Sequence, residues 1–447
     1  SICLVQKYKK DWENNMKAFK ESIKVFLAKT SAFFKKVGSF LNKYVWHYLR
    51  YVFVPIGKFF SWLFHFQAAR SIMSSIICVF IGIFVGFIVM LIRDPANCFA
   101  GLGVLLSSGF QGISEGDYDA ISHVIGVLTP MVLAGISISF AFKLGLFNIG
   151  ITGQLTMGAF LSLIFSFMGM PWYVCLLIGM VGGALIGFLS GFLKAKFNVN
   201  EVLSGIMFNW IVYYLCGLIG DYLPSDWIDS SNKTQLAKMS QNGRLPTLLS
   251  ENTADGYINP AYYNVTAGIF IAIIIAVIIW FILKYTKFGF ELKLCGSNKF
   301  AAKYAGINQN SNIVLSLAIS GAIAGICGYM VFATPSPKGF TFGALDGVML
   351  SDGFNGISVA LIGQTDPIGC IFSSFFLAYI NEGQTQIVNV SILYSKYYME
   401  LIKAVIIYVA SFSAFIAYLI KSSNEKSKGK IDASFKELYR SKKEETV

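Results

Sequence analysis

Apolar segments about as long as one bilayer crossing recur along this chain of 447 residues, from residue 71 almost to its end. A hydrocarbon core roughly 30 Å thick takes about 20 residues of helix to cross. Only 13% of the residues are charged, against roughly 25% in a soluble domain. The pattern predicts an all-α fold, a polytopic transmembrane helical bundle, and excludes a soluble enzyme. About ten segments are expected, at 72–92, 123–142, 153–168, 172–193, 203–222, 263–283, 312–333, 354–364, 367–382 and 397–420.

Three of these segments, which begin at 153, 354 and 367, are short for a full crossing. Lipid offers no partner for free backbone N–H and C=O groups, so a helix that stops inside the membrane must be surrounded by protein or water. Short, interrupted segments also line the transport path in many carriers. We therefore expect broken or half-helices, buried inside the bundle.

The net charge of +12 is concentrated at the two ends of the chain. Residues 1–70 hold 13 basic and 3 acidic residues, and residues 421–447 hold 8 and 5, so their net charges of +10 and +3 leave −1 for residues 71–420. Basic segments of membrane proteins stay on the cytoplasmic side, so both termini are expected there, in a multi-pass protein of the cell (plasma or inner) membrane. Binding to nucleic acid is not expected, because the charge is explained by membrane topology.

Three regions follow from hydropathy and charge. Residues 1–70 carry an apolar stripe at helical spacing, which predicts a cytoplasmic, basic amphipathic extension that lies on membrane lipids or, alternatively, docks on a partner. Residues 71–420 form the transmembrane domain, with an external loop at 223–262 and a cytoplasmic loop at 284–311, and 421–447 form a charged cytoplasmic tail. The lysines that mark the cytoplasmic side of the bundle are Lys194, Lys196, Lys284, Lys287, Lys293, Lys299 and Lys303.

The sequence gives little support to chemistry other than transport. Three histidines and eight cysteines without a CxxC pair predict no metal site and no cofactor bound by this chain. The GxxxxGK[ST] phosphate loop is absent from the sequence. Catalytic residues are likewise not expected, since no nucleophile, base or metal set converges on one segment pair. Energy for accumulation must then come from a partner, or the protein is a passive pore.

Residues 143–154, KLGLFNIGITGQ, place neutral polar side chains between two apolar segments. The glycines let the backbone leave helical geometry, and Asn148, Thr152 and Gln154 can each donate and accept hydrogen bonds at membrane depth. Phe147 could offer an apolar face to a solute. We interpret these four residues as candidates for the pathway of an uncharged polar solute; hydrogen bonding between helices is the alternative.

Two further stretches carry candidate pathway residues. In residues 198–211, Asn200 is predicted to cap a helix, whereas Asn209, about two turns further on, is a pathway candidate. In residues 351–369, Asn355 and Gln364 are candidates, and Pro367 breaks the helix. Asp366 is predicted to cap the half-helix that follows.

The cytoplasmic loop contains a predicted short helix from about Asn298 to Ala305, which Gly306 ends. A helix of this length has little core of its own. It therefore fits a groove on a partner, unless it is a plain connection.

Five stretches together resemble one family: FNIGITGQ (147–154), NEVLSGIMFNWI (200–211), FGFELKLCGSNKFAAKYAGI (288–307), AISGAIAGICG (318–328) and GFNGISVALIGQTDPIG (353–369). The chain resembles, over about residues 120–420, the permease subunit of an ABC importer of the branched-chain amino acid/simple sugar class, in its nucleoside-uptake subgroup. Residues 1–70 and the long loop 223–262 depart from that family's usual pattern.

The resemblance implies a transmembrane permease domain, at 71–420, that works by alternating access and is not itself an enzyme. It also implies a second homologous permease subunit, cytoplasmic ABC ATPases that bind ATP-Mg, and an extracellular substrate-binding lipoprotein. The short cytoplasmic helix would couple to the ATPase through Asn298, Lys299, Ala301, Ala302, Tyr304, Ala305 and Gly306. Nucleosides are the first expected substrates; a simple sugar such as ribose, or a stand-alone carrier or channel, are the alternatives.

Overall fold

The computed structural model describes residues 67–110, 118–229, 236–237, 239–248, 265–333, 340, 352–387 and 396–410, with single residues up to 422. The chain divides into two compact units, Arg70–Tyr418 and a second one made of Ser1–Ala69 with Leu419–Val447. The predicted extension up to residue 66, the tail beyond residue 422 and much of the loop 223–262 lie outside the described residues. The boundaries of the three predicted regions stay predictions.

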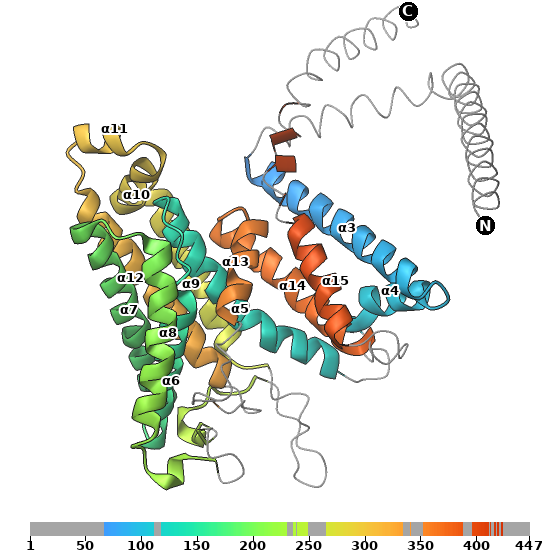
Figure 1. Cartoon of the computed structure of the whole chain (residues 1–447), viewed down its shortest axis with the longest axis horizontal. Helices are drawn as coiled ribbons and strands as arrows, with labels where there is room; N and C mark the ends of the chain where they lie inside the picture. Colours follow the sequence, from blue (N-terminus) through green and yellow to red (C-terminus); the bar gives the residue numbers. More distant parts are fainter. Residues whose placement is uncertain are drawn as a thin grey trace, which may run out of the picture. The chain divides into compact units, whose positions relative to one another are not determined.

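The described part of the chain is built from helices (Figure 1). It contains no named strand, only the isolated bridges Ile228–Leu236 and Thr247–Thr266. The all-α prediction is confirmed, and a helix occupies each predicted apolar segment. The helices are α3 Gln67–Arg93, α4 Cys98–Ser107, α5 Asp119–Lys143, α6 Ile151–Phe167, α7 Trp172–Phe197, α8 Glu201–Gly220, α9 Gly268–Tyr285, α10 Lys287–Ser297, α11 Lys299–Tyr304, α12 Gln309–Phe332, α13 Asp352–Ile362, α14 Pro367–Ile387 and α15 Lys396–Ala410, with the 3-10 turns η2 Ser108–Phe110, η4 Ser225–Trp227 and η5 Gln241–Gly243.

Five described helices are long and apolar enough to cross a membrane: Ala120–Lys143 of α5, and α7, α8, α9 and α12. α13 and α14 together form a sixth candidate, bent by 119° at a short break. At this break Gln364 and Thr365 have φ values of 51° and 55°, a left-handed conformation that ends a helix. α6, with 17 residues, is buried along most of its length. The prediction of a broken pair and of a short, buried helix is therefore confirmed.

Glycines bring the backbones of α7 and α12 into direct contact. Gly179, Gly183 and Gly187 follow one another at every fourth residue of α7, and they face Gly321 and Gly325 of α12. A Cβ added to Gly183 would lie 2.7 Å from the Cα of Gly325, closer than any real side chain comes. Small residues at this spacing let helices associate in a membrane through backbone packing. The α7–α12 pair, with α6 packed against both helices, is the scaffold of the bundle.

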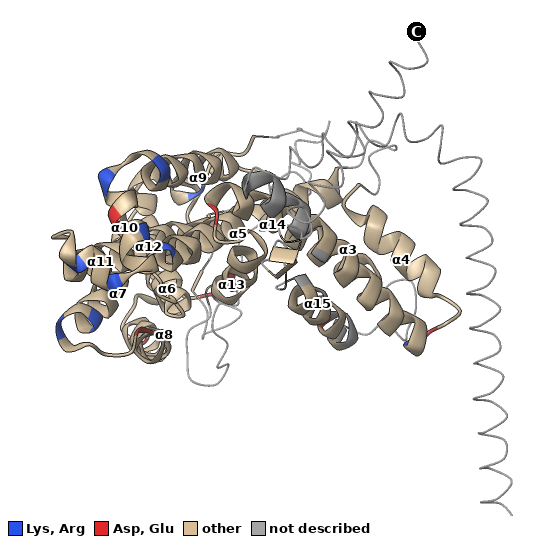
Figure 2. Cartoon of the chain, turned by 90° about the horizontal axis from the view of Figure 1, so that it is seen from above, with Lys and Arg blue, Asp and Glu red and all other residues tan. Residues whose placement is uncertain are grey.

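Basic residues of the described helices lie together at one end of the bundle (Figure 2). They are carried by the last turns of α7 and α9 and by the short helices α10 and α11. This end is the one for which the positive-inside rule predicts the cytoplasm.

Candidate functional site

The segment between α5 and α6 leaves helical geometry at Gly145, after Leu144 has ended α5. Gly145 has a φ of 79°, which a glycine adopts without strain. Leu144 and Leu146 turn into the core, so the segment is held inside the bundle. Phe147 is half-buried, with its ring edge-on to Phe142 at a centroid distance of 5.4 Å. The next residue, Asn148, is buried at the entrance to α6.

Asn148 and Gln154 form a reciprocal amide pair in this buried place. Asn148 Nδ2 donates to Gln154 Oε1 at 2.8 Å, and Gln154 Nε2 donates to Asn148 Oδ1 at 3.1 Å. Asn148 Nδ2 also donates to Ser320 Oγ of α12 at 2.8 Å. Ser320 and Ser137 of α5 then exchange hydrogen bonds from hydroxyl to carbonyl, each 2.7 Å long. One neutral polar network thus joins α5, α6 and α12, and we call it the amide junction.

The structure brings Asn148 and Gln154 together, as two of the predicted pathway residues. It adds Ser137 and Ser320, which the sequence reasoning missed. Their only signal in the sequence is that they are hydroxyl groups inside apolar segments. Contact of the amide junction with a solute stays a prediction, and the same bonds also fit the alternative of hydrogen bonding between helices.

Asn209 of α8 completes the first turn of α6. The backbone N–H of Gly153 donates to Asn209 Oδ1 at 2.7 Å, and Asn209 Nδ2 donates to the carbonyl of Ile149 at 3.1 Å. The residue that precedes α6, Gly150, supplies no side-chain cap, so Asn209 takes this place from another helix. Gly205 of α8 also lies against Gly150. Asn209 therefore holds the entrance to α6, and a contact between Asn209 and a solute stays a prediction.

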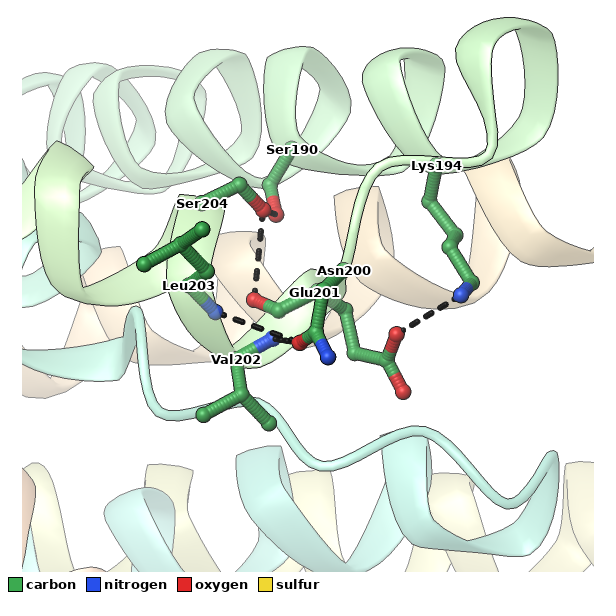
Figure 3. A network of polar contacts seen from close by, with 7 residues as sticks. All are labelled: Ser190, Lys194, Asn200, Glu201, Val202, Leu203 and Ser204. Carbon is green, nitrogen blue, oxygen red and sulfur yellow. Dashed lines mark hydrogen bonds and ion pairs between the residues drawn. The ribbon is translucent and has the colours of Figure 1, made fainter.

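The start of α8 is fastened to the end of α7 by the contacts drawn in Figure 3. Asn200 Oδ1 accepts from the N–H groups of Val202 and Leu203, at 2.9 and 3.3 Å, so the predicted cap is confirmed. Lys194 Nζ lies 2.9 Å from Glu201 Oε2, and both side chains are 18% exposed. Two serine hydroxyls add to this link: Ser190 and Ser204 lie 3.4 Å apart.

Thr152, in the first turn of α6, is 1% exposed. Its hydroxyl makes no hydrogen bond to any residue that the structure describes. Gly353, at the start of α13, lies against it. Asn355 follows on the same half-helix and is half-buried. Of the predicted residues, Thr152 thus lies in the first turn of α6 and Asn355 in the first turn of α13, and these two turns are neighbours.

Gln364 occupies a different place, at the break between α13 and α14. Lys143 Nζ donates to Thr365 Oγ1 at 3.2 Å, which ties the end of α5 to this break. Asp366 Oδ2 accepts from the N–H of Gly369 at 3.2 Å, so the predicted cap of α14 is confirmed. A helix of eleven residues spans about 16 Å. Asn355 is the fourth residue of α13, so about 10 Å of helix separates it from the end that precedes Gln364.

The predicted short cytoplasmic helix exists as α11. Asn298 Oδ1 accepts from the N–H groups of Phe300 and Ala301, both at 3.0 Å, and Gly306 follows the helix with a φ of 74°. Ala302 is buried, whereas Phe300 and Tyr304 are 78% and 94% exposed. Two exposed rings one helical turn apart form a surface that fits a partner. Phe300 was not among the predicted residues.

A helical membrane bundle with a broken span and a buried neutral polar junction has the construction of a transport protein. No group of metal-ligating side chains occurs in the described part of the chain. Residues 120–411 match the family described as branched-chain amino acid transport system / permease component. This chain belongs to that family of permeases.

Three relatives are named as permeases of guanosine or nucleoside ABC transporters. The guanosine ABC transporter permease protein NupP of Bacillus subtilis is 32% identical over 345 residues, which cover 75% of this chain and 92% of the relative. The nucleoside ABC transporter permease protein NupB of Lactococcus lactis is 31% identical over 72% of this chain and 85% of the relative. The guanosine ABC transporter permease protein NupQ of Bacillus subtilis is 28% identical over 56% of this chain and 76% of the relative. No solved structure matches this chain.

Proposed function

We propose that this chain is the transmembrane permease subunit of an ATP-driven importer for nucleosides. The amide junction carries this proposal, because its members are buried, uncharged and able both to donate and to accept hydrogen bonds. A nucleoside is an uncharged solute that offers donors and acceptors on both sugar and base. Two relatives that match most of this chain are named as guanosine and nucleoside permeases, which supports the same substrate class.

The pathway in this proposal runs past the amide junction and the first turn of α13. Asn148, Gln154 and Thr152 line it from the entrance to α6, with Phe147 beside them, and Asn355 faces them from α13. Asn209 acts by holding the first turn of α6, and Gln364 acts at the break where α13 meets α14. A solute that passes here exchanges its hydrogen bonds with water for bonds to these side chains.

The chain works with other subunits in this proposal. Two matched relatives, NupP and NupQ, are guanosine permeases of one organism, which supports a pair of homologous permeases. Cytoplasmic ABC ATPases bind ATP-Mg and supply the energy, and an extracellular lipoprotein delivers the solute. The N- and C-termini lie in the cytoplasm, on the side of the basic helix ends.

α11 is the contact with the ATPase. Phe300 and Tyr304 enter an apolar groove, and Lys299 and Lys303 face its rim. Because Ala302 is buried beneath these rings, a push on α11 reaches α10 and α12, on which it packs. The bundle then alternates between inward-open and outward-open arrangements.

Uptake by cells that express this chain with its neighbouring subunits tests the proposal. Radiolabelled uridine and adenosine are supplied with and without excess ribose. In parallel, the phosphate-loop lysine of the ATPase is replaced. We expect uptake that nucleosides block, that ribose leaves unchanged and that the ATPase variant abolishes. Full competition by ribose would move the substrate to sugars, and uptake that survives the ATPase variant would contradict an ATP-driven importer.

A further inference from the structure

Four buried hydroxyls in the described part of the chain make no hydrogen bond, those of Ser122, Thr152, Ser316 and Ser374. Thr152 is the one of these that lies in the first turn of α6. Its hydroxyl is buried, and none of the residues that the structure describes accepts or donates a hydrogen bond to it. Thr156, one turn further on the same helix, shows the ordinary arrangement: its Oγ1 donates to the carbonyl of Thr152 at 2.7 Å. A buried hydroxyl without a partner destabilises the fold, so its presence calls for a reason.

The surroundings of Thr152 suggest that reason. The first N–H groups of a helix have no acceptor within the helix and carry a partial positive charge. On the side of α8, Asn209 satisfies the N–H of Gly153. On the side of α13, Gly353 covers Thr152: a Cβ at residue 353 would lie 2.5 Å from Thr152 Oγ1 and 3.1 Å from its backbone nitrogen. The backbone of Gly353 therefore lies against both the hydroxyl and the backbone nitrogen of Thr152, at the start of α6.

α13, which covers Thr152, is shorter than α6, to which Thr152 belongs, and it ends at a bend. α6 is fixed in the scaffold, where a Cβ on Gly158 would lie 2.5 Å from the Cα of Gly325 on α12. α13 is a half-helix of eleven residues that packs along α5, with Gly356 against Ala134. It ends at the sharp bend formed by Gln364 and Thr365. Half-helices of this kind often form the substrate site in transporters, and the few residues at the end of an element are where a hinge can act.

We infer that Thr152 binds a sugar hydroxyl of the transported nucleoside, and that Gly353 covers this group in the conformation seen here. When the first turn of α13 moves away from α6, the hydroxyl of Thr152 becomes accessible beside the amide junction. A threonine hydroxyl both donates and accepts, as a sugar hydroxyl does, and the helix start favours an oxygen lone pair. This inference rests on the proposed function and adds a specificity-determining residue to it.

The test compares three variants in the complete transporter, with its partner subunits, reconstituted in lipid vesicles. Thr152→Val keeps the shape of the side chain and removes the hydroxyl, Thr152→Ser keeps the hydroxyl, and Thr156→Val is the matched control. Each is assayed for ATP-driven uptake of uridine and of its 2′-, 3′- and 5′-deoxy analogues. Thermal unfolding in detergent is measured on the same samples.

We expect Thr152→Val to lower kcat/KM for uridine about tenfold, the usual effect of one lost hydrogen bond. For the analogue that lacks the bonded hydroxyl, the same substitution has no effect, because wild type and variant then lack the same bond. Thr152→Ser retains uridine uptake. Thr152→Val unfolds at the same or a higher temperature than wild type, whereas Thr156→Val, which removes a bonded hydroxyl, unfolds at a lower one.

Two results would overturn the inference while the proposed function stands. One is uridine uptake by Thr152→Val at the wild-type kcat/KM. The other is an equal loss for uridine and all three deoxy analogues, which would mean that Thr152 does not meet the sugar. If the wild-type complex takes up no nucleoside at all, the proposed function itself fails, and the sugar contact fails with it.

Discussion

The α7–α12 interface and the amide junction of α5, α6 and α12 are both buried, yet they are built in different ways. At the first, glycines such as Gly183 and Gly325 bring two backbones into contact. At the second, amides and hydroxyls form a network, and the hydroxyl of Thr152 in the first turn of α6 has no partner among the described residues. Close backbone packing gives a fixed scaffold without polar groups. Polar groups that are satisfied only in part suit a region that exchanges partners, at a cost in stability.

The largest expected effect is a break in the scaffold. In Gly183→Ala, the new methyl group meets the backbone of Gly321 and Gly325, so the helices must separate. Overpacking of this kind typically costs about 1–3 kcal/mol in a core. We expect a lower thermal midpoint in detergent and less monodisperse protein in size-exclusion chromatography. Gly103→Ala in α4, where a Cβ has nothing within 4 Å, is the control, and equal profiles for the two variants would contradict the scaffold.

The second largest effect is expected when the two exposed aromatic rings of α11 are removed. Phe300→Ala together with Tyr304→Ala should lower ATP-driven uptake about tenfold, since an aromatic anchor at the centre of an interface can contribute about 2 kcal/mol. The amount of protein in the membrane should not change, because both rings are exposed in the isolated chain. Phe270→Ala, which removes another exposed ring from α9, is the control. Normal uptake by the double variant would contradict the proposal that α11 is the coupling helix.

A smaller effect is expected from Asn209→Leu. This variant distinguishes a residue that holds the start of α6 from residues that contact the solute. Asn209→Leu leaves the N–H of Gly153 and the carbonyl of Ile149 unpaired, at a cost of about 1–3 kcal/mol. We expect uptake of every nucleoside to fall by the same factor, so the ratio of uridine to adenosine uptake stays constant. A changed ratio would show that Asn209 touches the solute.

The smallest effect is expected at the link between α7 and α8. Glu201→Gln removes the ion pair with Lys194, which is partly exposed, so about 0.2–1 kcal/mol of stability should be lost. The difference from wild type should shrink as salt is added. Glu291→Gln is the control, because its contact with Lys287 is 3.8 Å long and the lysine is 90% exposed. A larger loss that salt does not change would contradict an electrostatic link.

Much of this architecture could be predicted from the sequence, because hydropathy and capping are local properties. The helix that each apolar segment forms, the caps at Asn200 and Asp366, and the break before Pro367 all follow from neighbouring residues. Two helices were not predicted. α4 has only ten residues, and α10 lies in a stretch too rich in lysine to be recognised by its hydropathy.

The partners within the site could not be predicted in the same way. Asn148 and Ser320 are 172 residues apart in the sequence, and the two bonds of Asn209 reach 56 and 60 residues back along the chain. No periodicity relates such positions. Glycines at every fourth residue, as in α7, are typical of packed membrane helices, but nothing in the pattern identifies their partners on α12.

The central claim is that the solute passes the amide junction, and the transporter's preference among substrates tests it most directly. In the complete transporter, Gln154→Leu breaks the amide pair with Asn148, while Ser137→Ala, as the control, keeps that pair and removes one bond behind it. Initial rates of ATP-driven uptake are measured for uridine, adenosine and guanosine. We predict that Gln154→Leu alters the preference among the three nucleosides by about tenfold, the worth of one buried hydrogen bond, and that Ser137→Ala leaves the preference unchanged. Wild-type rates and preference in Gln154→Leu would contradict the claim that the solute passes this junction.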